Sequence, residues 1–182
     1  MDRLRSRTSK QKLPRPATVN WSPPDQCEYK TNFDGAMFPD VAEAGIGVVI
    51  RNKEGEVMAA LSEKIPQPSS VTMLEMLAAR RAAIFIHEVG LRNSVLEGDS
   101  EIVIKALQNG DKFQTAFGHL CRDTLSYAKA LQSFSFSHTH RQGNCVADAL
   151  AKKARYCSSL TVWMESVPPD ISCLVLAEKH CS

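Results

Sequence analysis

Alternating polar and apolar residues near the start of the chain indicate strands that are buried on one face. Tyr29, Thr31 and Phe33 share a face in the segment 29–36, and comparable segments follow at 44–51 and 56–63. A polar turn joins the last two of these segments. The pattern therefore predicts three neighbouring antiparallel strands.

The apolar period then changes to that of a helix. Ser70 offers an N-cap for a helix over 71–89, and Gly90 stands at its C-cap position. The apolar residues of this helix form one stripe, and Glu75 is the charged member of that stripe. Burying an unpaired carboxylate is costly, so Glu75 requires a cation there, unless it lies at the rim or pairs with an arginine.

Strands alternate with helices in the rest of the chain. The expected elements are a strand at 94–99, a helix at 100–108, a helix at 115–131, a strand at 134–138 and a helix at 144–155, for which Asn144 offers an N-cap. Strands separated by helices are typical of parallel pairing. The whole pattern predicts an α/β fold with a mixed five-stranded sheet flanked by helices, in which the first three strands are antiparallel and the later ones parallel.

Composition divides the chain into three parts. Residues 1–26 are basic and carry prolines, which predicts a flexible N-terminal linker. Residues 27–157 contain all the expected elements and form the predicted domain. Residues 158–182 are apolar but short and interrupted by prolines, so we expect a short C-terminal extension.

The net charge of +2 conceals an uneven distribution. Residues 1–20 carry six Lys and Arg against Asp2, so the remainder carries sixteen Lys and Arg against nineteen Asp and Glu. Because its net charge is negative, this part of the chain lacks a broad positive potential that would attract polyanions such as nucleic acids. Contact with nucleic acid must therefore be local or come from the basic N-terminal segment.

The six cysteines have irregular spacings without a Cys-x-x-Cys pair, and the chain starts without an apolar signal segment. This pattern indicates reduced thiols in an intracellular protein, in the nucleus or the cytoplasm. No segment approaches the ~18 to 20 apolar residues of a membrane span, so we expect no membrane partner. We also expect a monomer.

Carboxylates occur on four of the expected elements. Asp34 is on the first strand, Glu75 on the long helix, Asp99 at the end of the fourth strand and Asp148 in the first turns of the last helix. Taken alone, Asp34 also suits a turn, and Asp99 also suits a helix N-cap. Open α/β sheets place their chemistry at the carboxyl ends of strands, where elements far apart in sequence meet.

Such a set of carboxylates is the donor type that Mg²⁺ or Mn²⁺ prefers. Two such ions ~3.5 to 4 Å apart can activate a water and stabilise the leaving oxygen of a phosphodiester. Gly35 and Ala36, directly after Asp34, leave open backbone beside its carboxylate. The four acids therefore predict a site for two divalent metal ions.

Four motifs resemble the ribonuclease H type 1 domain, in a variant similar to the reverse-transcriptase-like domain of plant proteins and plant non-LTR retroelements. The motifs are Asn32–Ala36, Leu74–Ala79, Leu96–Ser100 and His140–Lys152. The resemblance extends from Glu28 to Arg155. It implies a ribonuclease H-like fold and the metal-dependent endonucleolytic hydrolysis of the RNA strand of RNA/DNA hybrids, with recognition of the 2′-hydroxyl.

The resemblance also implies a role for each acid. Asp34 matches the acid shared by both ions, Glu75 and Asp99 match ligands of the ion nearer the leaving group, and Asp148 completes the other site. The residues that correspond to candidate substrate contacts are Ser70, His138, His140, Arg141, Asn144 and Lys152. Structural or solvent roles for the histidines, a surface ion pair for Arg141 and a solvated helix side for Lys152 remain open.

The chain departs from the family pattern at two places that concern substrate binding. Only residues 110–114 separate the two middle helices, so the basic helical protrusion of some bacterial members is absent. Ser70–Val71 replaces their Thr-Asn phosphate pocket. An alternative function is therefore a domesticated module with weak or no catalysis that binds nucleic acid or a protein. An exonuclease of the same fold would have a second carboxylate where Ala36 stands.

Overall fold

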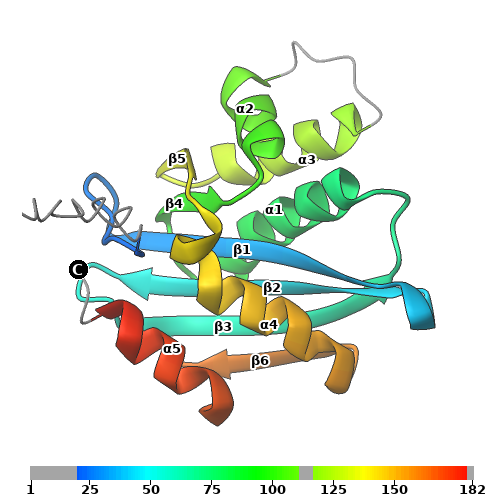
Figure 1. The fold of residues 1–182 in the computed structure, drawn as a ribbon. Helices are drawn as coiled ribbons and strands as arrows, with labels where there is room; N and C mark the ends of the chain where they lie inside the picture. The colour runs from blue at the N-terminus through cyan, green and yellow to red at the C-terminus, as the bar shows by residue number, and fades with distance from the viewer. Residues whose placement is uncertain (1–19, 111–116, 180–182) are drawn as a thin grey trace, which may run out of the picture.

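A computed structural model of the chain describes residues 20–110 and 117–179 (Figure 1). Within these residues, six strands form one sheet in the order β5-β4-β1-β2-β3-β6. The strands are β1 (Tyr29–Phe38), β2 (Glu43–Asn52), β3 (Val57–Pro66), β4 (Asn93–Gly98), β5 (Ser133–His138) and β6 (Leu160–Met164). The α-helices are α1 (Val71–Glu88), α2 (Glu101–Asn109), α3 (Gly118–Lys129), α4 (Cys145–Lys153) and α5 (Pro169–Lys179). Short 3-10 turns are η1 (Pro39–Val41), η3 (Arg141–Asn144) and η4 (Ala154–Tyr156).

The sheet confirms the predicted α/β class and the order of strand directions. β1, β2 and β3 pair antiparallel, whereas β4 pairs parallel with both β1 and β5. The predicted number of five strands is wrong, because β6 pairs antiparallel with β3 at the sheet edge. β6 has only five residues and lies in the segment expected as an extension, so its pattern was too short to be recognised.

The first long helix follows the prediction closely. Its apolar stripe is buried against the sheet, where Leu74, Ala78 and Phe85 join the main core. The Ser70 hydroxyl accepts the Met73 backbone N–H at 3.1 Å and caps the helix. Gly90, directly beyond the C-cap, has φ +76°, a conformation that glycine adopts without strain. Glu75 is buried with the stripe.

α4 and α5 lie on the face of the sheet opposite α1 and form a second, smaller core with β2 and β3 (Figure 1). α4 approaches β2 closely because β2 has glycine at two positions. A Cβ on Gly47 would overlap the Ala147 carbonyl oxygen, and one on Gly45 would overlap that of Ala151. The Ser62 hydroxyl of β3 donates to the Leu150 carbonyl oxygen at 2.7 Å. These contacts set the height of α4 above the sheet.

The packed body extends beyond residues 27–157 on both sides. Trp21, in the segment expected as a linker, is 2% exposed and donates its indole N–H to Asn32. In the C-terminal segment, Val167 and Ile171 are buried in the second core. Residues 1–19 and the predicted start of the helix at residue 115 lie outside the described residues. No helix within the described ranges is both long enough and apolar enough to cross a membrane.

Candidate metal centre

Asp34 lies where β1 continues past its pairing with β4. β1 pairs with β4 only over residues 30–32, while its pairing with β2 continues to Phe38. The β4-facing edge of β1 is therefore open at Asp34, close to the carboxyl end of β4. Asp99 follows β4 directly, at the point where the chain turns into α2.

Helix α1 brings Glu75 to the same place. A Cβ on Gly35 would overlap the Leu74 side chain, so the glycine next to Asp34 allows α1 to pack directly against β1. Glu75 is the next residue along that helix. The room expected beside Gly35 for a ligand is thus occupied by α1 on that side, and this close approach brings Glu75 to the Asp34 carboxylate.

Three of the four predicted acids converge. Asp34, Glu75 and Asp99 each offer a carboxylate oxygen, and these three oxygens lie within 4.8 Å of one another. Asp34 and Glu75 are each 6% exposed. The Asp99 side chain is 15% exposed and faces the solvent side of the group. β1, α1 and the end of β4 therefore supply a compact set of carboxylates that is partly open to solvent.

Burial and the closeness of these carboxyls raise the pKa values of two of them, so the group does not ionise fully at neutral pH. Burial, followed by the charge of Asp99, raises the pKa of Asp34 to about 7. Burial, followed by the charge of Asp34, raises the pKa of Glu75 to about 9. The Gly35 N–H donates to Asp34 Oδ1 at 2.8 Å. At neutral pH the pair therefore retains a proton that a bound cation would displace.

One oxygen of this group has no partner in the described part of the chain. Glu75 Oε2 is buried and makes no hydrogen bond there. Buried polar atoms are nearly always satisfied, so an orphaned carboxylate oxygen among other carboxylates fits a missing cation. The donor set is all oxygen, which suits Mg²⁺ or Mn²⁺. The residues present therefore fit a divalent metal ion.

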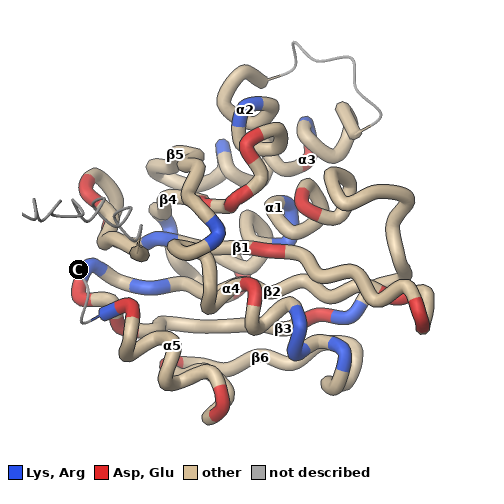
Figure 2. Tube along the Cα trace, in the orientation of Figure 1, with Lys and Arg blue, Asp and Glu red and all other residues tan. Residues whose placement is uncertain are grey.

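Asp148 lies outside the 4.8 Å group but is close enough to act on it. It is in the first turn of α4, and its charge contributes to the raised pKa of Asp34. Its side chain is 31% exposed and pairs with Lys152 at 2.6 Å, four residues along the helix. Figure 2 marks acidic positions in red on both α4 and β1.

The other predicted site residues lie in different settings. His138 Nε2 donates to the Asp99 carbonyl oxygen at 3.1 Å, and its ring meets that of His140 edge-on at 5.8 Å between centroids. Arg141 is 88% exposed, with Nε 3.8 Å from the Asp99 carboxylate. Ser70 is exposed at the start of α1. Asn144 is fully buried, so its side chain faces the interior.

Sequence reasoning missed a buried polar group beneath these acids. Asn32, Arg51 and Glu178 are all buried and hydrogen-bonded to one another in a chain. The sequence could have identified Asn32, because it lies on the same strand face as Asp34, two residues later. No sequence pattern identifies Glu178, because it follows an apolar stretch in a segment that carries no functional motif.

Comparison with known proteins agrees with this geometry. Residues 32–154 match the reverse transcriptase-like family. No curated protein matches the chain in sequence. Ribonuclease H1 from the archaeon Halobacterium salinarum has a similar structure, with a TM-score of 0.62 and 26% identity, over 70% of this chain and 97% of that protein.

Two further structures share the fold at lower identity. LC11-RNase H1 from compost, in complex with an RNA/DNA hybrid, has a TM-score of 0.60 and 22% identity, over 69% of this chain and 95% of that one. The protease-reverse transcriptase of prototype foamy virus has a TM-score of 0.58 and 20% identity, over 78% of this chain and 23% of that one. The chain belongs to the reverse transcriptase-like family and has the fold of ribonuclease H.

Proposed function

We propose that this protein is a divalent-metal-dependent ribonuclease that cleaves the RNA strand of RNA/DNA hybrids. The observation that carries the proposal is the convergence of Asp34, Glu75 and Asp99 within 4.8 Å, from three separate elements. Similarity to the Halobacterium salinarum enzyme supports it. The fold is that of a ribonuclease H-type hydrolase.

Asp34, Glu75 and Asp99 would hold one Mg²⁺ or Mn²⁺ ion, and Asp34 with Asp148 would hold a second. When bound, such ions lower the pKa of an attacking water and neutralise the charge that develops on the leaving oxygen. Asp34 is central because it belongs to the group with Glu75 and Asp99 and because the charge of Asp148 also acts on its carboxyl. Asp99 stands at the solvent side, where a phosphodiester could approach.

The exposed residues around the carboxylates are candidates for holding the nucleic acid. Arg141 can contact a phosphate, since its side chain is 88% exposed beside Asp99. His138 Nε2 donates to the Asp99 carbonyl oxygen and its ring contacts that of His140, so both histidines are candidates for contacts with phosphate or 2′-hydroxyl oxygens near Asp99. Ser70 is the N-cap of α1, which carries Glu75, and Lys152 lies in the last turn of α4, which carries Asp148. Outside residues 1–20, nineteen Asp and Glu outnumber sixteen Lys and Arg, so we expect these contacts to be local.

The direct test is cleavage of labelled RNA/DNA hybrid, duplex DNA and duplex RNA in Mg²⁺ or Mn²⁺. Wild type should cut only the RNA strand of the hybrid. Asp34→Asn and Asp99→Asn should each lose at least about 100-fold in kcat, because each removes a proposed ligand. Full cleavage by either variant would refute the metal assignment. Hybrid binding without cleavage in either metal would instead identify a binding module.

A further inference from the structure

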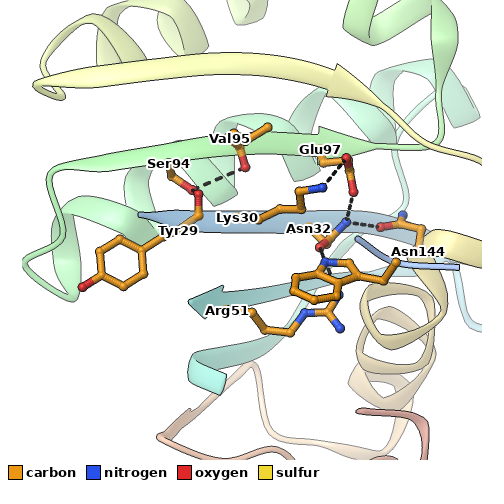
Figure 3. Close-up of polar contacts among 9 residues, drawn as sticks. Tyr29, Lys30, Asn32, Arg51, Ser94, Val95, Glu97 and Asn144 are labelled. Atoms are coloured by element: carbon orange, nitrogen blue, oxygen red, sulfur yellow. Dashed lines mark hydrogen bonds and ion pairs between the residues drawn. The ribbon is translucent and has the colours of Figure 1, made fainter. Parts of the chain in front are cut away.

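A buried polar network lies between β1, β4 and the turn before α4 (Figure 3). Its hub is the Asn32 side chain, which is 0% exposed. The Asn32 amide donates to Glu97 at 3.0 Å and to Asn144 at 3.3 Å. Its carbonyl oxygen accepts from Trp21 Nε1 at 2.9 Å and Arg51 Nη2 at 3.1 Å. The four hydrogen bonds allow Asn32 one orientation.

The network reaches the backbone beside Asp34 through Asn144. The Asn144 amide donates to the Phe33 carbonyl oxygen at 2.9 Å. Asn144 precedes α4, but its side chain makes no capping hydrogen bond to that helix. The Asn144 side chain, which was expected to cap the helix, instead links η3 to β1. Helix α4 carries Asp148, and any of its N-terminal N–H groups that η3 does not satisfy need another acceptor.

Glu178 of α5 supplies that acceptor. Burial raises the pKa of the Glu178 carboxyl, whereas Arg51 and then the Val146 backbone N–H, at the second residue of α4, favour its charged form. The same carboxylate pairs with Arg51 Nη1. The side chains of Arg51 and Glu178 are 1% and 9% exposed. An anion at a helix N-terminus is favourable because it meets the positive end of the helix dipole.

Arg51 links this cap to the hub. Its guanidinium lies 4.0 Å from the centre of the Trp21 ring, and it donates to Asn32 on one side and to Glu178 on the other. The route from Glu178 to the metal centre therefore has two branches. One runs along α4 to Asp148, and the other runs through Arg51 and Asn32 to β1.

We propose that Glu178 is a positioning residue for the metal centre, holding Asp148 in register with Asp34 by capping α4 and by orienting Arg51. The inference rests on the proposed function. It assigns a catalytic purpose to a segment outside the family match of residues 32–154. A purely structural role would change the stability of the fold without changing how the folded protein binds metal.

Two variants test this role at a temperature well below the unfolding transition. Glu178→Gln keeps the shape and an acceptor oxygen but loses the charge, and we expect about a 3-fold weaker Mn²⁺ affinity and about a 3-fold lower kcat. The double variant Arg51→Met with Glu178→Met removes the cap without leaving a buried charge, and we expect about a 10-fold loss of both. KM for hybrid should change by less than about twofold in each, because neither residue faces the substrate.

The readouts are Mn²⁺ titration calorimetry, amide hydrogen exchange and steady-state cleavage. Asp148→Asn serves as the reference that identifies the Asp148-dependent part of Mn²⁺ binding. The Val146 amide should exchange faster in both test variants. Asp170→Asn is the matched control, since it removes the exposed Lys153–Asp170 ion pair that also joins α4 to α5. It should leave affinity, exchange and kcat unchanged.

The outcomes separate this inference from the proposed function. Wild-type Mn²⁺ affinity and wild-type Val146 exchange in both folded variants would overturn the positioning role, even with hybrid cleavage intact. A wild-type protein that binds Mn²⁺ but cleaves no hybrid would overturn the proposed function. In that case, weaker Mn²⁺ affinity in the two variants would still support the positioning role of Glu178.

Discussion

The Asp34 and Glu75 carboxyls share a buried position that favours a proton or a cation between them. Their raised pKa values, about 7 and about 9, come first from burial and then from neighbouring acids. In the unfolded chain both groups would titrate near pKa ~4. Without metal, the folded protein therefore binds more protons than the unfolded chain from weakly acidic to alkaline pH.

This difference predicts that the metal-free protein loses stability as pH rises. Between about pH 5 and pH 9, its free energy of unfolding should fall by on the order of 2 kcal/mol more than that of Asp34→Asn. The reason is that the substitution removes one of the carboxyls that must ionise in the folded state. Urea denaturation with a chelator present, at several pH values, measures the effect.

The control for this titration is Asp123→Asn, which removes a half-exposed carboxyl of α3. It should follow the wild-type pH dependence. Equal slopes for wild type and Asp34→Asn would show that the Asp34–Glu75 pair does not hold its proton in the folded protein.

At the scale of elements, the contact between α4 and β2 decides where Asp148 stands. Gly47 lies under α4, where a Cβ would overlap the backbone of Ala147 and Ala151. Backbone atoms cannot move aside as a flexible side chain can. The helix must therefore lift from the sheet if a side chain is added at this position.

We expect Gly47→Ala to destabilise the protein by about 3 kcal/mol, through overpacking beneath α4. Gly90→Ala provides the comparison, because Gly90 has φ +76° but nothing within 4 Å of an added Cβ. That substitution should cost only about 1 kcal/mol, from backbone strain alone. Chemical denaturation measures both. A smaller loss for Gly47→Ala than for Gly90→Ala would contradict the close approach of α4.

At the scale of the whole molecule, segments from both ends of the chain complete the second face of the sheet. β6 extends the sheet beyond β3, and α5 packs beside α4 (Figure 1). Trp21 covers the Arg51 guanidinium from the N-terminal side. The folding unit therefore includes segments on either side of residues 27–157.

We predict that a chain ending at residue 157 loses at least about 4 kcal/mol of stability or fails to fold. It would leave Arg51 buried without Glu178, and removing one partner of a buried pair is strongly destabilising. Adding Arg51→Met to the truncated chain should recover part of the loss. Circular dichroism melting of the truncated and full chains measures this. A truncated chain as stable as the full one would place the domain boundary at 157.

Much of the fold was predictable because apolar residues recur along most of its elements with the clear spacing of a strand or a helix. The α1 stripe, its Ser70 cap and the β1–β3 meander all follow from residue order. β6 was missed because five residues carry too little pattern, and pairing with β3 stabilises it. Asn144 suggested a helix cap, but a tertiary partner on β1 competes for its side chain. Local sequence cannot show that competition.

The sequence alone determined which elements form and which of them carry the acids, because hydrophobic period and turn residues act over short distances. Only the tertiary structure decided how close those acids come. β1 continues past the end of its pairing with β4, and Leu74 packs onto Gly35. These two features bring three carboxylates together. Likewise, residue order could not reveal that Glu178 of α5 pairs with the buried Arg51 of β2, because that contact joins residues 127 positions apart and depends on the packing of the whole second face.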